Sequence, residues 1–119
     1  MTTFNTLREA NWHRHREWFG DKEVSLLFRI VELAGEAGEL ANEAKKLHRE
    51  NLGVAGSKAN LQHLYDELAD LVISADLLGM HLGVDMASII EKKFNQTSTK
   101  YRLKTRLQLT PIKQPKRKN

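Results

Sequence analysis

The chain has 119 residues, 40% of them hydrophobic, and no cysteine. This length suits one domain with a buried core, and the lack of cysteine excludes a disulfide framework, a thiolate metal site and a cysteine nucleophile. The first thirty residues contain no secretory apolar segment and no run of about 18 apolar residues occurs, so we expect a cytoplasmic protein with no membrane partner.

The net charge of +4 is unevenly distributed. Eight of the 19 basic side chains and none of the 15 acidic ones lie in residues 100–119, so residues 1–99 carry a net charge of −4. Because the folded part is acidic, nucleic acid is not its expected partner. We expect one domain over residues 1–109, followed by a flexible basic tail over residues 110–119, which contains both prolines.

The predicted fold is an all-α bundle of four helices, because the prolines are confined to the tail and strict apolar/polar alternation is missing. In chain order, the helices are expected over residues 3–19, 22–50, 57–82 and 86–99. Ser57 is the expected N-cap of the third helix and Asp85 that of the fourth. Gly83 is expected to end the third helix in a left-handed conformation.

Four glutamates form a line on the second predicted helix. At about 100° per residue, Glu32, Glu36, Glu39 and Glu43 fall within an arc of roughly 60°, at the border of the apolar face. Like charges four residues apart repel by a few tenths of a kcal/mol per pair, and the first three glutamates lack the usual lysine four residues later. A bound cation would offset this repulsion.

The third predicted helix carries a second acidic pair, Glu67 and Asp70. Apolar side chains cover most of this helix, which predicts a central position in the bundle and leaves little solvated surface for the two acids. Isolated buried carboxylates are costly. Glu67 and Asp70, together with Glu36 and Glu39, offer the oxygen ligands that Mg²⁺ prefers. This set of ligands predicts metal-assisted hydrolysis at phosphorus.

These two pairs also carry a family resemblance. Glu36-Ala-Gly-Glu39, followed after 27 residues by Glu67-Leu-Ala-Asp70, resembles the signature of the MazG-like all-α nucleoside triphosphate pyrophosphohydrolases. Leu82-Gly-Val-Asp85 is similar to the turn that precedes the last helix of that family. The resemblance covers roughly residues 24–101.

The resemblance implies that water attacks the α-phosphorus of a nucleoside triphosphate, giving the monophosphate and pyrophosphate. It implies that Glu36, Glu39, Glu67 and Asp70 are the catalytic residues and bind Mg²⁺, with Mn²⁺ as a possible substitute. Deoxynucleotides are the expected substrates, and cleaning of the nucleotide pool is the expected role. The family also implies a homodimer or homotetramer.

Two further groups of residues are expected to contact the substrate. Lys93 and Asn95 are the candidates for its phosphates, although the arginine that often follows in the family is replaced by Thr97. For the base, the candidates are His15, Trp18 and Phe28, which could stack on it. Aromatic residues at helical spacing are more often part of a core. The alternative for these three residues is therefore a place in the core with no contact to the base.

A hypothesis from a different class remains open. The chain could be a non-catalytic helical interaction or regulatory protein that binds nucleic acid through its basic tail, with the acids serving solubility. The position of the acids separates the two hypotheses. Acids that line an inward site favour the enzyme, whereas acids that face bulk water favour the interaction protein.

Overall fold

A computed structural model of the chain describes residues 2–112. These residues form four α-helices and no strand, which confirms the all-α prediction: α1 (Thr3–Phe19), α2 (Leu26–Asn51), α3 (Leu61–Leu82) and α4 (Met86–Lys100). Most of the predicted flexible tail, residues 113–119, lies outside the described residues.

Side-chain caps set the helix boundaries and correct two predicted starts. α2 begins at Leu26 rather than at residue 22, because the Ser25 hydroxyl accepts a hydrogen bond from the Phe28 amide at 3.1 Å. α3 begins at Leu61 because Asn60, not Ser57, is its N-cap. The two other predicted signals are confirmed: Asp85 caps α4, and Gly83 ends α3 with a left-handed φ of 68°.

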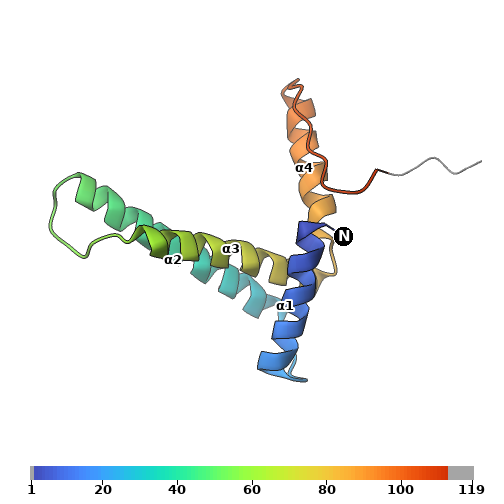
Figure 1. Cartoon of the computed structure of the whole chain (residues 1–119), viewed down its shortest axis with the longest axis horizontal. Helices are drawn as coiled ribbons and strands as arrows, with labels where there is room; N and C mark the ends of the chain where they lie inside the picture. The colour runs from blue at the N-terminus through green and yellow to red at the C-terminus, as the bar shows by residue number, and fades with distance from the viewer. Residues whose placement is uncertain (1, 113–119) are drawn as a thin grey trace, which may run out of the picture.

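The four helices form an open arrangement rather than a closed four-helix bundle (Figure 1). α2 and α3 lie side by side as an antiparallel pair, α1 crosses α3 near its C-terminal end, and α4 departs from α3 after a bend of 105°. Among the described residues no single helix is long and apolar enough to cross a membrane; α3 and α4 reach that criterion only together, as this bent pair.

The segment that follows α4 turns back along that helix (Figure 1). The Asn95 side chain bonds both the amide and the carbonyl of Leu107, at 2.8 and 2.9 Å. Glu91 accepts hydrogen bonds from the Leu109 amide at 2.7 Å and from the amide and hydroxyl of Thr110. Thr110, the first residue of the predicted tail, is therefore bound to α4.

Much apolar surface is left uncovered in the single chain. Ala87 is the only apolar residue among those described that is fully buried. A stripe along α3, formed by Leu61, Tyr65, Leu68 and Val72, is between 46% and 57% exposed. The Cα radius of gyration is 18.9 Å, whereas a compact chain of this length has about 13–14 Å. Single chains rarely leave apolar patches of this kind uncovered unless they bind something.

A buried polar network fastens α1 to α3. Asp76, which is 1% exposed, accepts hydrogen bonds from Arg8 Nε and Nη2 at 3.1–3.2 Å and from Asn11 Nδ2 at 2.9 Å. Gly79 of α3 lets the Arg8 side chain of α1 lie close to the α3 backbone, since a Cβ at this position would lie 2.8 Å from Arg8 Nη2. A buried carboxylate is tolerated only when it is paired in this way.

Replacing this carboxylate should be costly. We expect Asp76→Ala to lower the free energy of unfolding by about 3–5 kcal/mol, because it leaves Arg8 and Asn11 without their buried partner. Urea unfolding at one fixed protein concentration measures the change. As a control, Glu9→Ala on the exposed side of α1 should stay within about 0.5 kcal/mol of the original chain. Equal stability of the two variants would contradict this role of the network.

Candidate metal centre

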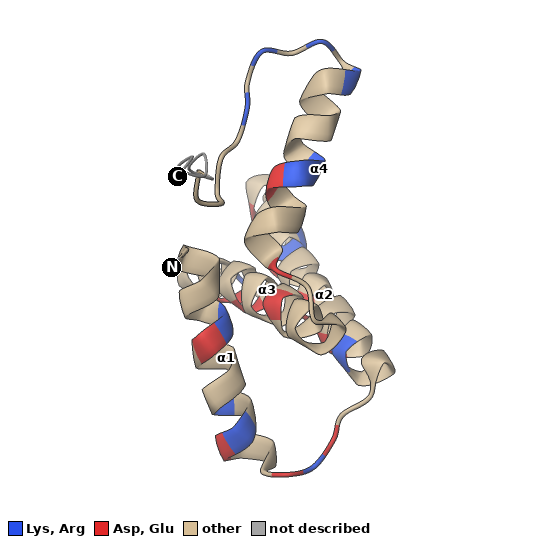
Figure 2. Cartoon of the chain, turned by 90° about the vertical axis from the view of Figure 1, so that its right-hand side faces the viewer, with Lys and Arg blue, Asp and Glu red and all other residues tan. Residues whose placement is uncertain are grey.

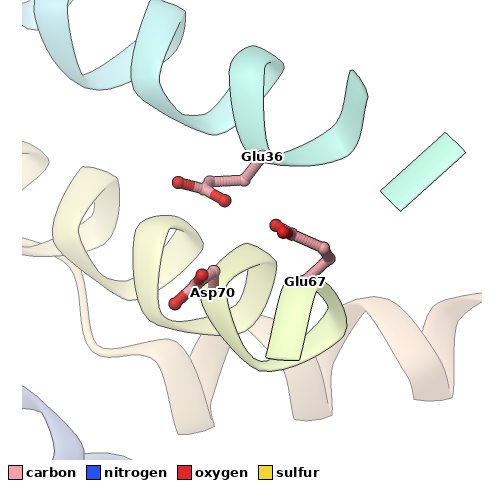
Figure 3. A group of neighbouring side chains, drawn as sticks. All are labelled: Glu36, Glu67 and Asp70. Carbon is pink, nitrogen blue, oxygen red and sulfur yellow. The ribbon is translucent and has the colours of Figure 1, made fainter. Parts of the chain in front are cut away.

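Three of the four predicted carboxylates meet between α2 and α3 (Figure 3). Glu36 projects from α2 toward α3, Glu67 projects from α3 toward α2, and Asp70 lies beside them on the neighbouring turn of α3. Each of the three offers one oxygen, and these oxygens all lie within 4.8 Å of one another. The spacing of three residues places Glu67 and Asp70 on adjacent turns of one helix face, so an oxygen of each lies near Glu36.

The fourth carboxylate, Glu39, lies against Glu67. A hydrogen bond with Glu39, burial, and the nearby charges of Glu39, Glu36 and Asp70 raise the pKa of Glu67 to about 7. The pKa of Glu36 is also raised, first by burial and then by the charges of Glu39 and Asp70. The four groups therefore form one like-charged cluster, in which the raised pKa of Glu67 favours its protonated form when no cation is bound.

Two oxygens of this cluster are buried without a hydrogen-bond partner in the described part of the chain, namely Glu36 Oε2 and Glu67 Oε2. Buried carboxylate oxygens are normally hydrogen-bonded or bound to a cation. The donor set consists only of carboxylate oxygens, which suits a hard divalent ion such as Mg²⁺. The residues present thus fit the predicted metal, although Asp70 and Glu39 are exposed in the single chain.

The two remaining glutamates of the line on α2 have basic partners instead. Arg29 Nη1 donates to Glu32 at 3.0 Å, and Lys46 Nζ donates to Glu43 at 3.0 Å. The hydrogen bond from Lys46 lowers the pKa of Glu43. Neither glutamate belongs to the described group of carboxylates whose oxygens lie within 4.8 Å of one another. Figure 2 shows the acidic positions on the facing helices α2 and α3, while the segment after α4 carries basic ones.

The predicted phosphate contacts lie on a different part of the chain. α3 extends twelve residues beyond Asp70 to Leu82, about 18 Å at 1.5 Å per residue. α4, with Lys93 in its middle, then departs sideways (Figure 1). Lys93 therefore cannot reach the carboxylates of its own chain, and the Asn95 amide is engaged with Leu107.

The predicted base contacts come together in one small cavity. His15, Trp18 and Phe28 line a slot of about 190 Å³ between α1 and the start of α2. Arg29 lines the same slot, is only 2% exposed and was not among the residues predicted from the sequence. A signal for it was present, because Arg29 lies within an apolar stretch and three residues before Glu32, the spacing of a helical ion pair.

Comparison with known proteins identifies the family of the chain. Residues 35–110, more than half of the chain, match the MazG-like family. The chain belongs to the MazG-like family, which indicates a fold of the nucleotide pyrophosphohydrolase type. It is also similar to "Gene 37 protein" of Mycobacterium phage L5, with 30% identity over 80 residues that make up 67% of this chain and 69% of that protein. No solved structure matches.

The raised pKa of Glu67 predicts how stability depends on pH when metal is absent. Below its unfolded pKa of 4.5 the group is protonated in both states, and between 4.5 and about 7 only the folded state holds the proton. The contribution of Glu67 to the free energy of unfolding is therefore fully present at low pH, and it is lost as the pH rises through about 7. In EDTA, Glu67→Gln should remove the loss and have the higher melting temperature at pH 8.

Magnesium should reverse the order of the melting temperatures of the original chain and the Glu67→Gln variant. At pH 8, excess Mg²⁺ should raise the melting temperature of the original chain by binding the folded state, and it should raise that of Glu67→Gln much less. Differential scanning fluorimetry with and without EDTA measures both effects. If Mg²⁺ shifts the two melting temperatures equally, the cluster is not the metal site.

Proposed function

We propose that this chain is a Mg²⁺-dependent nucleoside triphosphate pyrophosphohydrolase. The observation that carries the proposal is that one oxygen from each of Glu36, Glu67 and Asp70 lies within 4.8 Å of the others, while a buried oxygen of Glu36 and one of Glu67 lack partners in the described residues. Membership of the MazG-like family supports the same activity. The products would be a (deoxy)nucleoside monophosphate and pyrophosphate, and the role would be cleaning of the nucleotide pool in the cytoplasm.

In this proposal Glu36, Glu39, Glu67 and Asp70 hold Mg²⁺. Bound there, the ion would lower the pKa of a water molecule and neutralise charge on the phosphates. The helix pair supplies the positioning, since α2 and α3 hold the carboxylates on opposing faces before the substrate arrives. One of the four carboxylates would also orient the attacking water by accepting its hydrogen bond.

The active form is proposed to be a homodimer or homotetramer. The exposed α3 stripe, formed by Leu61, Tyr65, Leu68 and Val72, supports this, because a second copy could cover it. The position of Lys93 supports it as well. Since Lys93 is too far from the carboxylates of its own chain, it would contact the phosphates bound by another copy.

The direct test is an assay of pyrophosphate release from each common dNTP in the presence of Mg²⁺. We expect release of pyrophosphate and the matching monophosphate. Glu39→Gln and Glu67→Gln should each lower kcat/KM by about 100-fold or more, since even outer partners of metal ligands account for roughly 10–100-fold. Helical circular dichroism should remain unchanged. As a matched control, Glu17→Gln on the exposed face of α1 should retain full activity.

The competing hypothesis makes a different prediction. A nucleic-acid-binding interaction protein would release no pyrophosphate with Mg²⁺ or Mn²⁺, and it would bind DNA in a salt-sensitive manner that is lost when residues 111–119 are deleted. Well-folded protein with this behaviour would overturn the enzymatic proposal. Activity that survives the deletion would dispose of the competing hypothesis.

A substitution in the α3 stripe tests whether this stripe is the interface between copies of the chain. Leu68→Glu introduces a charge at a position that is 51% exposed in the single chain, so it should leave the protomer helical while blocking burial of the stripe. We expect the variant to sediment as a monomer and to lose activity together with assembly. Analytical ultracentrifugation measures the first effect. A Leu68→Glu variant that assembles like the original chain would contradict the proposed interface.

A further inference from the structure

Much of the positive charge of the chain lies on a folded element, α4 and the turn that follows it (Figure 2). All 15 acidic side chains lie in residues 1–91, whereas residues 92–112 carry six basic side chains and no acidic one. All six are exposed, namely Lys92, Lys93, Lys100, Arg102, Lys104 and Arg106. Within residues 2–112 none of them forms an ion pair. This part of the fold therefore carries a positive field that its own acids do not neutralise.

Hydrogen bonds fix the turn that carries these cations. The amides of Arg102 and Leu103 donate to the carbonyls of Thr99 and Ser98 at 3.1 and 2.7 Å. Arg102 has a left-handed φ of 57°, a conformation that glycine adopts freely but a residue with a side chain disfavours. Arg106 Nη1 donates to the Leu103 carbonyl at 2.9 Å, and its Nη2 donates to the Thr99 hydroxyl at 3.4 Å. Such strained turns persist where the surrounding structure holds them, and they are common at binding sites.

A groove on α4 lies beside this turn. Its volume is about 550 Å³. It is lined by Lys92, Asn95, Gln96, Thr99 and Lys100. Lys92 and Lys100 are eight residues apart, about 12 Å along the helix, and Arg106 adjoins the groove through its contact with Thr99. The groove thus has a cation at each end, an arrangement that suits a chain of phosphates better than a single anion.

An exposed aromatic ring lies among the cations. Tyr101 is 63% exposed and stands between Lys100 and Arg102 in the sequence. Lys100 Nζ lies 5.4 Å from the centre of its ring. Proteins that bind single-stranded nucleic acids combine a cationic groove for the backbone with aromatic rings on which unpaired bases stack. The bases of a duplex already stack on one another, so the exposed ring favours a single strand.

The proposed hydrolysis does not use these residues. Lys93, the candidate phosphate contact, lines a separate apolar groove that includes Phe94. The dipole of α4 favours a cation at Lys100, in the last turn of the helix, but it gives no reason for Lys92 in the middle. The cations other than Lys93 therefore have no role in the site described above.

We propose that the basic surface, formed by Lys92, Lys100, Tyr101, Arg102, Lys104 and Arg106, binds a single-stranded nucleic acid. The cations contact phosphates of the strand, and Tyr101 stacks on one base. This surface belongs to the folded part of the chain, so it differs from the tail that binds nucleic acid in the competing hypothesis. It is also independent of the proposed hydrolase activity.

Fluorescence anisotropy with the whole chain and a labelled oligothymidylate tests the proposal. EDTA is present, so that the carboxylate cluster takes no part. The dissociation constant should rise with salt concentration, because the cations compete with counterions for the phosphates. An abasic oligomer of the same length and charge should bind about 5- to 150-fold more weakly, the range for one stacked base. Equal affinity for the two oligomers would overturn the proposal.

Variants of the whole chain locate the binding, since the tail is the same in all of them. Tyr101→Ala should weaken binding of the oligothymidylate about 5- to 150-fold, whereas Tyr101→Phe, which keeps the ring, should bind like the original chain. Lys100→Gln should weaken binding and reduce the slope of log affinity against log salt concentration by about 0.7. As a charge-matched control, Lys58→Gln in the exposed loop before α3 should change neither quantity.

The contrary outcomes are distinct. Binding that is unaffected by both Tyr101→Ala and Lys100→Gln would assign the interaction to the tail and overturn the proposal. Failure to bind the oligothymidylate, together with salt-sensitive self-association that Lys100→Gln abolishes, would also overturn it, because the cations would then face the acidic side of a second copy. The binding assay contains no triphosphate, so its result is separate from the success or failure of the proposed hydrolase.

Discussion

Repulsion between carboxylates across the α2–α3 pair is the constraint on which the site depends. The antiparallel pairing of the two longest helices brings Glu36 opposite Glu67 and Asp70, with their oxygens within 4.8 Å. Burial and like charge then raise the pKa of Glu67 to about 7. A protein assembled only for stability would avoid such a cluster, so its presence in the contact between two helices favours a cation-binding role.

The rest of the protomer is arranged around this pair. The buried Asp76 network fixes α1 against α3, and α1 in turn supplies one wall of the slot beside Arg29. On the other side, the bend of 105° after α3 carries α4 away from the carboxylates. The single chain thus brings together the predicted metal ligands and the predicted base contacts, while Lys93 lies on the helix that departs from them.

The sequence predicted the number of helices and most boundaries because capping and glycine signals are local. Asp85 and Gly83 were recognised in this way. The start of α3 was misplaced, because Ser57 and Asn60 are both good caps and only the folded loop, where Arg49 bonds the Ser57 carbonyl, selects between them. The contact of Arg29 with His15 and the engagement of Asn95 with Leu107 could not be predicted, because both join residues that only folding brings close, whereas the pair of Arg29 with Glu32 has a local helical spacing.

The most direct test of the central claim is to locate the cation. Crystals of the chain grown with Mn²⁺ and a non-hydrolysable dNTP analogue, measured by anomalous diffraction, would show the ion itself. We expect anomalous peaks between α2 and α3, at direct coordination distance from oxygens of Glu36, Glu67 and Asp70, and none for Glu67→Gln. Peaks found only elsewhere, or a cluster that remains without metal when the analogue is bound, would contradict the assignment.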